Sequence, residues 1–98
     1  MDEYPLSLRG EIDLANADAV LAALRAHAAA RNGPLVVDCM ALEFLDASGL
    51  RAFVIADNEL RRQQRRLSLV NVRPLLARVL DVCGLNDLLI PTNEAVLA

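Results

Sequence analysis

Residues 35–51 read Leu-Val-Val-Asp-Cys-Met-Ala-Leu-Glu-Phe-Leu-Asp-Ala-Ser-Gly-Leu-Arg. The apolar start at 35–37 predicts a strand buried on both faces, as in the middle of a sheet that helices cover. A turn then leads to Ser48, where we expect a helix to begin with the serine as its N-cap. The stretch therefore predicts a buried strand followed by a helix, with Ser48 at the junction.

Strand and helix patterns alternate on both sides of this stretch. In chain order the expected elements are a strand at 6–9 followed by a turn at 10–13, a helix at 16–30, a strand at 35–37, a helix at 48–62, a strand at 67–70, a helix at 74–84, a short strand at 88–90 and a last turn of helix at 92–96. Such alternation implies right-handed crossovers and a mostly parallel sheet. We expect an α/β fold, a small sandwich with a mostly parallel, mixed sheet of about four strands and four helices.

The composition narrows the class of protein. With 98 residues, 55% of them hydrophobic and 23% charged, the chain is long enough for one globular domain, spanning residues 1–98. A net charge of −3 argues against nucleic-acid binding, although four arginines gather at 61–66, which we interpret as a solvated helix end. No apolar stretch approaches the ~18 residues that span a bilayer, and the first residues do not resemble a signal peptide. We expect a cytoplasmic protein without membrane insertion.

Catalytic motifs are missing from the sequence. The chain has no lysine and therefore no phosphate-binding loop of the Gly-Lys type, and its four glycines form no dinucleotide fingerprint. Ser48 lacks the flanks of a nucleophile elbow, and the only histidine, His27, lies in an Ala-rich helix, where we expect it at the surface near the C-terminal end. We expect neither catalysis nor a bound cofactor.

Three aspartates and two cysteines are the candidate metal ligands of the sequence. Asp13, Asp38 and Asp46 lie near strand ends and could gather around Ser48, either to hold a metal or, as we expect, to set the charge there. Cys39 and Cys83 lack the short spacing of zinc ligands. We expect no metal site and two reduced cysteines in the core.

The helix after Ser48 has two faces. A core stripe contains Phe53 and Leu60, and at 100° per residue the face shared with Ser48 contains Arg51, Ala52, Ile55, Asn58, Glu59 and Arg62. This face is either a solvated surface or a partner site with Ile55 at its centre and arginines at its rim, and an exposed Ile55 would also favour a weak dimer. Ser48 itself is either a simple cap or a modification site, since a helix N-terminus tolerates phosphate.

Taken together, the ordered motifs Gly-Glu-Ile-Asp-Leu-Ala-Asn-Ala at 10–17, Val-Val-Asp at 36–38, Phe-Leu-Asp-Ala-Ser-Gly-Leu-Arg at 44–51 and Gly-Leu at 84–85 resemble the STAS domain family. In particular they resemble bacterial anti-sigma factor antagonists, over nearly the whole chain. The resemblance implies a single STAS domain at 1–98. Only residues 1–9 precede the first motif, fewer than is usual in the family, so one sheet edge could be incomplete.

The resemblance also implies a function. The unphosphorylated form would bind an anti-sigma factor that is also a serine kinase, and this binding would release the sigma factor. Phosphorylation of Ser48 would switch the binding off. A metal-dependent serine phosphatase would remove the phosphate and so reset the switch. Asp46 takes the acidic position two residues before the serine, and Asp13 ends the first motif. The expected partner-binding residues are Asp13, Asp46, Ala47, Ser48, Gly49, Arg51, Ala52, Ile55, Asn58, Glu59 and Arg62. Alternatively, the same face would dock on the ATPase subunit of a lipid-transporting ABC system.

Overall fold

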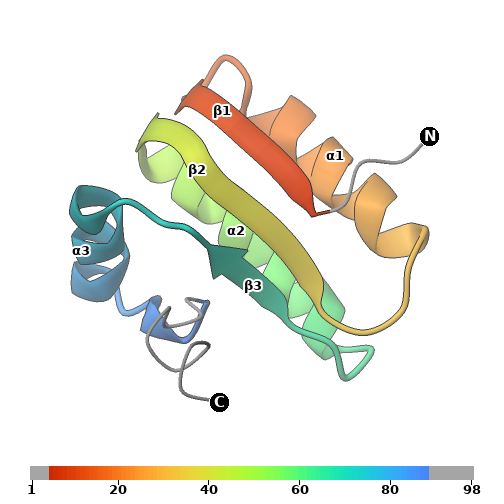
Figure 1. Cartoon of the computed structure of the whole chain (residues 1–98). Coiled ribbons are helices and arrows are strands. Elements are labelled where there is room, and N and C mark those ends of the chain that lie inside the picture. The colour runs from red at the N-terminus through yellow and green to blue at the C-terminus, as the bar shows by residue number, and fades with distance from the viewer. Residues whose placement is uncertain (1–4, 89–98) are drawn as a thin grey trace.

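The computed structural model describes residues 5–88 and shows an α/β fold of three parallel strands and three α-helices in this part of the chain. The elements are β1 (Leu6–Ile12), α1 (Ala17–Ala29), β2 (Leu35–Leu45), α2 (Ala47–Arg61), β3 (Leu67–Val70), α3 (Pro74–Val82) and a short 3-10 helix, η1 (Asn86–Leu88). The strand order is β1-β2-β3, with β2 in the centre (Figure 1).

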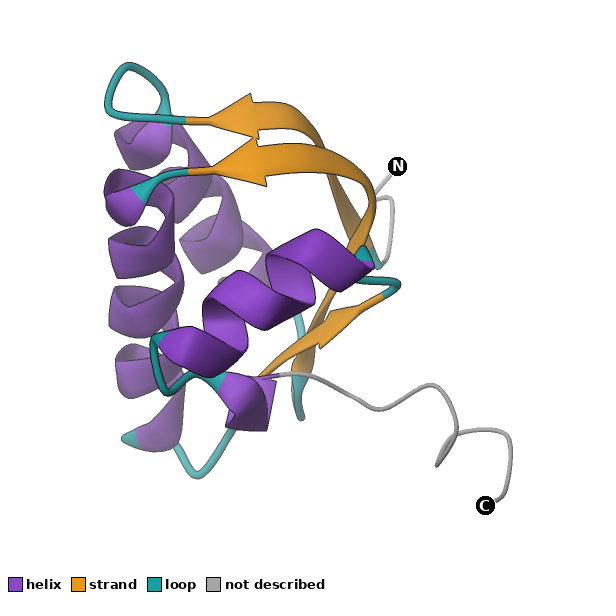
Figure 2. Cartoon of the chain, turned by 90° about the vertical axis from the view of Figure 1, so that its left-hand side faces the viewer, coloured by secondary structure: helices purple, strands orange, loops and turns teal. Residues whose placement is uncertain are grey.

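The two long helices form one layer and the sheet forms the other. α1 and α2 lie side by side behind the sheet, as the two perpendicular views agree (Figures 1 and 2). β3 pairs with only the first part of β2, from Leu35 to Asp38. Beyond that point α3 packs beside β2, and Arg73 Nε at its start donates to the carbonyl oxygen of Met40 at 3.2 Å. No element within residues 5–88 covers the other face of β1 and β2, where Met40 and Phe44 are exposed.

The core lies between the sheet and the α1–α2 layer. Leu24 of α1 and Phe53 of α2 are fully buried there in one apolar cluster with residues of the three strands, and α3 adds Leu76 and Leu80. These are apolar positions at helical spacing, and the predicted core residues Phe53 and Leu60 are both buried. The strand at 67–70 has the predicted bounds, α3 begins at the predicted residue, and the other helix ends differ from prediction by one or two residues.

β2 is much longer than the sequence pattern indicated. It pairs with β1 from Val37 opposite Leu6 to Leu45 opposite Ile12, and two bulges put nine residues of β2 against seven of β1. The buried positions of β2 are Leu35, Val37, Cys39, Leu42 and Leu45. Their spacing changes from two to three after Cys39, because each bulge inserts one residue on this strand. The loss of strict alternation explains why a strand of only 35–37 was predicted.

Other predictions also need correction. The first strand continues through the turn predicted at 10–13, and Gly10 lies at a bulge with φ +71°, which glycine adopts without steric cost. The sheet in residues 5–88 has three strands, all parallel, where about four in a mixed sheet were expected. Leu88 ends η1 and is not part of a strand. Residues 89 and 90 and the predicted last helical turn lie outside the described residues.

The two cysteines differ in environment. Cys39 is free and fully buried, as predicted, and its burial raises the pKa of its thiol to about 12. Cys83 is free but exposed, so its prediction as a core residue was wrong. α3 ends at Val82, and Cys83 follows as its C-cap, beyond the inward-facing stripe.

The arginines at 61–66 do not form a simple solvated helix end. Asp57, 4% exposed, accepts from the backbone N–H of Leu67 at 2.9 Å and from Arg61 Nε at 2.8 Å, and Arg66 Nε lies 3.4 Å from the same carboxylate. Both arginines also reach Asp87, at 2.7 and 3.2 Å. These ion pairs connect the end of α2, the start of β3 and η1.

In the part of the chain described, no helix is long and apolar enough to cross a membrane.

Candidate functional site

The first two strand-to-helix junctions lie next to each other. Ile12, the last residue of β1, pairs with Leu45, the last residue of β2, and the N–H of Asp46 donates to the carbonyl oxygen of Ile12 at 3.1 Å. Asp13 and Asp46 therefore start neighbouring connections at the carboxyl edge of the sheet. This edge is the usual place for functional loops in parallel α/β sheets.

Asp46, and not Ser48, is the N-cap of α2. Asp46 has extended backbone angles, and its Oδ1 accepts from the N–H of Ser48 at 2.8 Å and of Gly49 at 3.2 Å. Ser48 is the second residue of the helix. The prediction of Ser48 as the cap was therefore wrong. Aspartate is an equally good cap, and Asp46 comes two residues before the serine. Ser48 still lies in the first turn, at the positive end of the helix dipole.

The side chain of Ser48 borders a groove of about 230 Å³ between the first halves of α1 and α2. The groove is lined by Leu14, Ala17, Asp18, Leu21, Ser48, Arg51, Ala52 and Ile55. Ser48 is half-buried, and no group within residues 5–88 forms a hydrogen bond with its hydroxyl. The hydroxyl is thus available at the wall of a mixed groove whose apolar side includes Ile55.

Gly49 is required where α2 begins. A Cβ at this position would lie 2.6 Å from Cδ1 of Leu45 and 2.9 Å from Cγ2 of Ile12, both in buried side chains. Such distances are too short for van der Waals contact, so any larger residue would push the helix start away from the strand ends. The glycine therefore lets Ser48 lie close to both strand-to-helix junctions.

The connection from β1 to α1 is held in a defined shape. Asn16 accepts from the N–H of Asp13 at 2.9 Å and donates to the carbonyl oxygen of Glu11 at 2.8 Å, while the Asp13 carboxylate accepts from the N–H of Ala15 at 2.9 Å. This loop presents Leu14, which is 81% exposed and lines the groove. Neither Leu14 nor Asn16 was predicted. A leucine in a turn of otherwise small and polar residues was the available signal.

The predicted acidic cluster does not form. Asp13 and Asp46 are at adjacent junctions, but Asp38 lies opposite Ser7, seven residues before Leu45 along β2 and thus roughly 20 Å away. Asp38 accepts instead from the Met40 N–H at 2.9 Å and from Asn71 Nδ2 at 3.1 Å. Within residues 5–88 no group of three potential ligands could hold a metal ion.

The other predicted partner-binding residues are distributed along α2. Arg51 and Ile55 line the groove with Ser48, and Ala47, Asn58 and Arg62 are exposed. Gly49 and Ala52 are buried, and Ala52, 3% exposed, also lines the groove.

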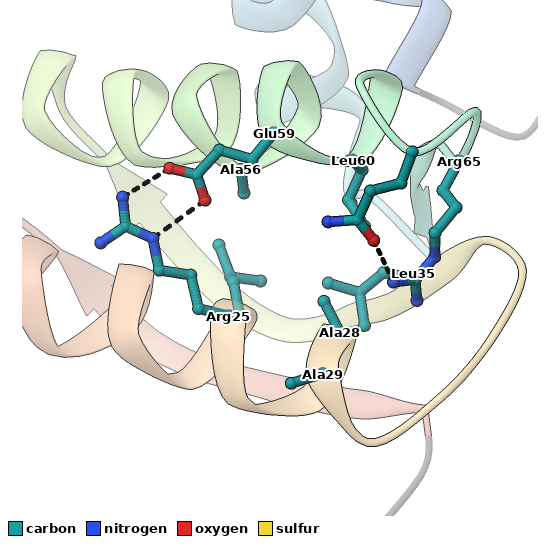
Figure 3. A pocket seen from close by; sticks show the side chains of 10 residues that line it. Arg25, Ala28, Ala29, Leu35, Ala56, Glu59, Leu60 and Arg65 are labelled. Atoms are coloured by element: carbon teal, nitrogen blue, oxygen red, sulfur yellow. Dashed lines mark hydrogen bonds and ion pairs between the residues drawn. The ribbon is translucent and has the colours of Figure 1, made fainter.

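Glu59 belongs to a different environment, nearer the end of α2. Arg25 of α1 donates to its two carboxylate oxygens at 2.9 and 2.6 Å (Figure 3). These hydrogen bonds lower the pKa of Glu59 and raise that of Arg25. His27 lies in the last turn of α1, as predicted, and Nδ1 is 3.1 Å from the carbonyl oxygen of Ala23.

Comparison with known proteins gives consistent matches. Residues 2–91 match the family model described as "Mlab, STAS domain". The anti-sigma-B factor antagonist of Listeria monocytogenes is 31% identical over 88 residues, which are 90% of this chain and 77% of that protein.

Solved structures agree with these sequence matches. The crystal structure of an anti-sigma factor antagonist from Mycobacterium paratuberculosis matches with a TM-score of 0.76 and 29% identity, covering 99% of this chain and 86% of that one. The anti-sigma factor antagonist SpoIIAA in its unphosphorylated form matches with a TM-score of 0.73 over 92% of this chain and 81% of its own. At 24% identity, the second match supports the fold alone.

Proposed function

The chain belongs to the STAS domain family of anti-sigma factor antagonists, and we propose that it binds an anti-sigma factor through the groove beside Ser48, with phosphorylation of Ser48 as the off switch. In this proposal the chain is a single cytoplasmic STAS domain that carries out no chemistry of its own. The anti-sigma factor is a serine kinase that transfers the terminal phosphoryl group of ATP to Ser48 Oγ. A metal-dependent serine phosphatase hydrolyses the phosphoserine.

The observation that carries this proposal is the position of the Ser48 hydroxyl. It lies in the first turn of α2 at the wall of a groove, and Asp46 rather than Ser48 caps the helix. Phosphorylation of the hydroxyl would therefore break no hydrogen bond that stabilises the helix. The groove also offers apolar contact at Leu14 and Ile55 and positive charge at Arg51, which suits a protein partner.

Phosphorylation can release a partner without unfolding the domain. Phosphoserine carries about −1.5 to −2 charges, and the positive end of a helix dipole favours negative charge. Against one acidic group of the partner ~8 Å away, at an effective dielectric constant of ~20, each unit of added charge costs roughly 2 kcal/mol. This is more than tenfold in affinity, before steric bulk is considered.

Arg51 gives a second route to release. It lies three residues after Ser48 on the same face of α2, a spacing at which helical side chains meet. A phosphate on Ser48 would pair with this guanidinium and withdraw it from the partner. Arg51→Gln would therefore weaken partner binding and reduce the further effect of phosphorylation.

The test is capture of partners from the native cell lysate by wild type, Ser48→Ala and Ser48→Asp, with Gln64→Glu as a charge control on the exposed turn after α2. We expect wild type, Ser48→Ala and the control to capture a small serine kinase and Ser48→Asp to lose it. Purified kinase and ATP should phosphorylate wild type but not Ser48→Ala. Phosphate on the alanine variant would refute the assignment of Ser48.

The second candidate function is an accessory role on the ATPase subunit of a lipid-transporting ABC system. One observation favours this second function: the family model that matches the chain is described as "Mlab, STAS domain" and not as an antagonist. The same capture experiment separates the two functions. Equal capture of a transporter ATPase by wild type and Ser48→Asp would favour the accessory role, since that role needs no phosphorylation.

A further inference from the structure

A second hollow lies between the last halves of α1 and α2, at the opposite end of these helices from Ser48 (Figure 3). Its volume is about 220 Å³. The buried side chains of Leu24, Leu35 and Leu60 contribute its apolar lining. No sequence motif indicated this site, and the proposed function does not use it.

Small side chains create the hollow. Ala28 of α1 faces Ala56 of α2 across it, and Ala29 lies at its exposed margin. The space exceeds the ~150 Å³ of an apolar cavity that takes up benzene. It is smaller than the ~300–1,000 Å³ of sites that enclose drug-sized ligands. An occupant is therefore small, with an apolar body.

The two ends of the hollow differ in charge. At one end Arg25 and Glu59 neutralise each other through two hydrogen bonds of 2.9 and 2.6 Å. At the other end Arg65 has no acidic partner among the residues that the structure describes. Its Nε donates to the carbonyl oxygen of Gly33 at 2.7 Å and its Nη1 to Gln63 Oε1 at 3.2 Å.

One nitrogen of this guanidinium has no acceptor. Nη2 of Arg65 is buried, and no group within residues 5–88 accepts its hydrogens. A buried N–H without an acceptor is unfavourable, and a guanidinium binds carboxylates with strong, charge-assisted hydrogen bonds. The Gln63 amide is exposed and its bond to Nη1 is long, so a carboxylate can replace it. Because Nη2 is buried, an anionic head group reaches this guanidinium by taking the place of the Gln63 amide at Nη1.

We propose that this hollow binds a small carboxylate whose apolar chain or ring has about six carbons, a size set by the comparison with benzene. The hydrocarbon contacts Leu24, Leu35 and Leu60, and the carboxylate oxygens accept from the guanidinium of Arg65. The ligand lies between the same two helices that form the groove at Ser48. This site stands independently of the proposed function, because it needs no anti-sigma factor and no phosphate.

The test is a titration of the isotope-labelled protein followed by its amide NMR signals. Three probes separate the contributions: hexanoate, the neutral hexanamide of the same chain length, and acetate as the head group alone. We expect saturable shifts around Leu35, Ala56 and Arg65 with hexanoate, at least tenfold weaker binding of hexanamide, and no saturation with acetate. Equal binding of hexanoate and hexanamide would overturn the role of Arg65.

Variants that fill the hollow give a second, independent test. Ala28→Leu places a larger side chain inside it, and we expect about a tenfold or greater loss of hexanoate affinity. Ala29→Leu, at the exposed margin, gives the same test without strain in the core, and Ala26→Leu is the matched control on the exposed face of α1. Unchanged hexanoate binding by both filling variants, or equal loss in the control, would overturn the proposal.

Discussion

The capping of α2 gives the sharpest test of the candidate site, because the sequence predicted Ser48 as the cap and the structure has Asp46 in this role. In the structure the Asp46 carboxylate accepts from two backbone N–H groups, at 2.8 and 3.2 Å, and the Ser48 hydroxyl accepts from neither. We therefore expect Asp46→Ala to destabilise the protein and Ser48→Ala to leave its stability almost unchanged. Sequence patterns alone favoured the opposite result.

The magnitudes follow from the lost interactions. Replacing an N-cap aspartate by alanine costs typically ~1 kcal/mol, and the loss of its charge at the helix N-terminus adds about 0.3–1 kcal/mol. The free energy of unfolding should fall by about 1–2 kcal/mol, and Tm by roughly 4–8 °C for each kcal/mol. Ser48→Ala loses no hydrogen bond and gains up to ~0.5 kcal/mol of helix propensity.

Urea unfolding followed by far-UV circular dichroism measures these changes, since the chain has no tryptophan for fluorescence. Asp46→Asn is the matched control, because asparagine keeps the acceptor oxygen and loses only the charge, so it should recover more than half of the stability. If Ser48→Ala loses 1 kcal/mol or more while Asp46→Ala loses little, the serine is the cap. Ser48 would then have a structural role that complicates its use as a switch.

Three further outcomes test other parts of the structure. Asp57→Ala should lower the free energy of unfolding by about 1–3 kcal/mol in urea, because it leaves the N–H at the start of β3 without its buried acceptor and removes one partner from Arg61 and from Arg66. Glu59→Gln should be less thermally stable than wild type near pH 7 but not near pH 3. The hydrogen bond from Arg25 lowers the pKa of Glu59 in the folded protein. The stability that this pair contributes is therefore present above the unfolded-state pKa of Glu59 and is lost as pH falls through the folded-state pKa. Iodoacetamide should modify Cys83 alone in the native protein and Cys39 only after denaturation, as mass spectrometry would show.

Each of these three predictions has a result that would contradict it. A loss below 1 kcal/mol for Asp57→Ala would mean that the ion pairs at the end of α2 contribute little. A stability difference for Glu59→Gln that persists undiminished near pH 3 would point to packing in place of charge. Two modified cysteines in the native protein would contradict the burial of Cys39.

Local patterns predicted the helices well and the central strand poorly. Apolar residues at helical spacing around Leu24, Phe53 and Leu80 indicated all three helices, because each helix buries one stripe. The pattern in β2 changes period after Cys39, where bulges shift the pairing with β1. Bulges depend on a neighbouring strand, so a rule based on alternation within one strand does not detect them.

By itself, the sequence determined the order of strands and helices and the apolar stripes of the core. It also determined the family resemblance, which puts Ser48 at the position of the phosphorylated serine. All of these depend on residues close together in the chain. Only the tertiary structure decided which residue caps α2, which aspartates lie together, and that Leu14 shares a groove with Ser48. It also brought Arg25 to Glu59 across 34 positions. These outcomes depend on strand register and helix packing, which bring distant residues together, and no local periodicity encodes the distance between two side chains.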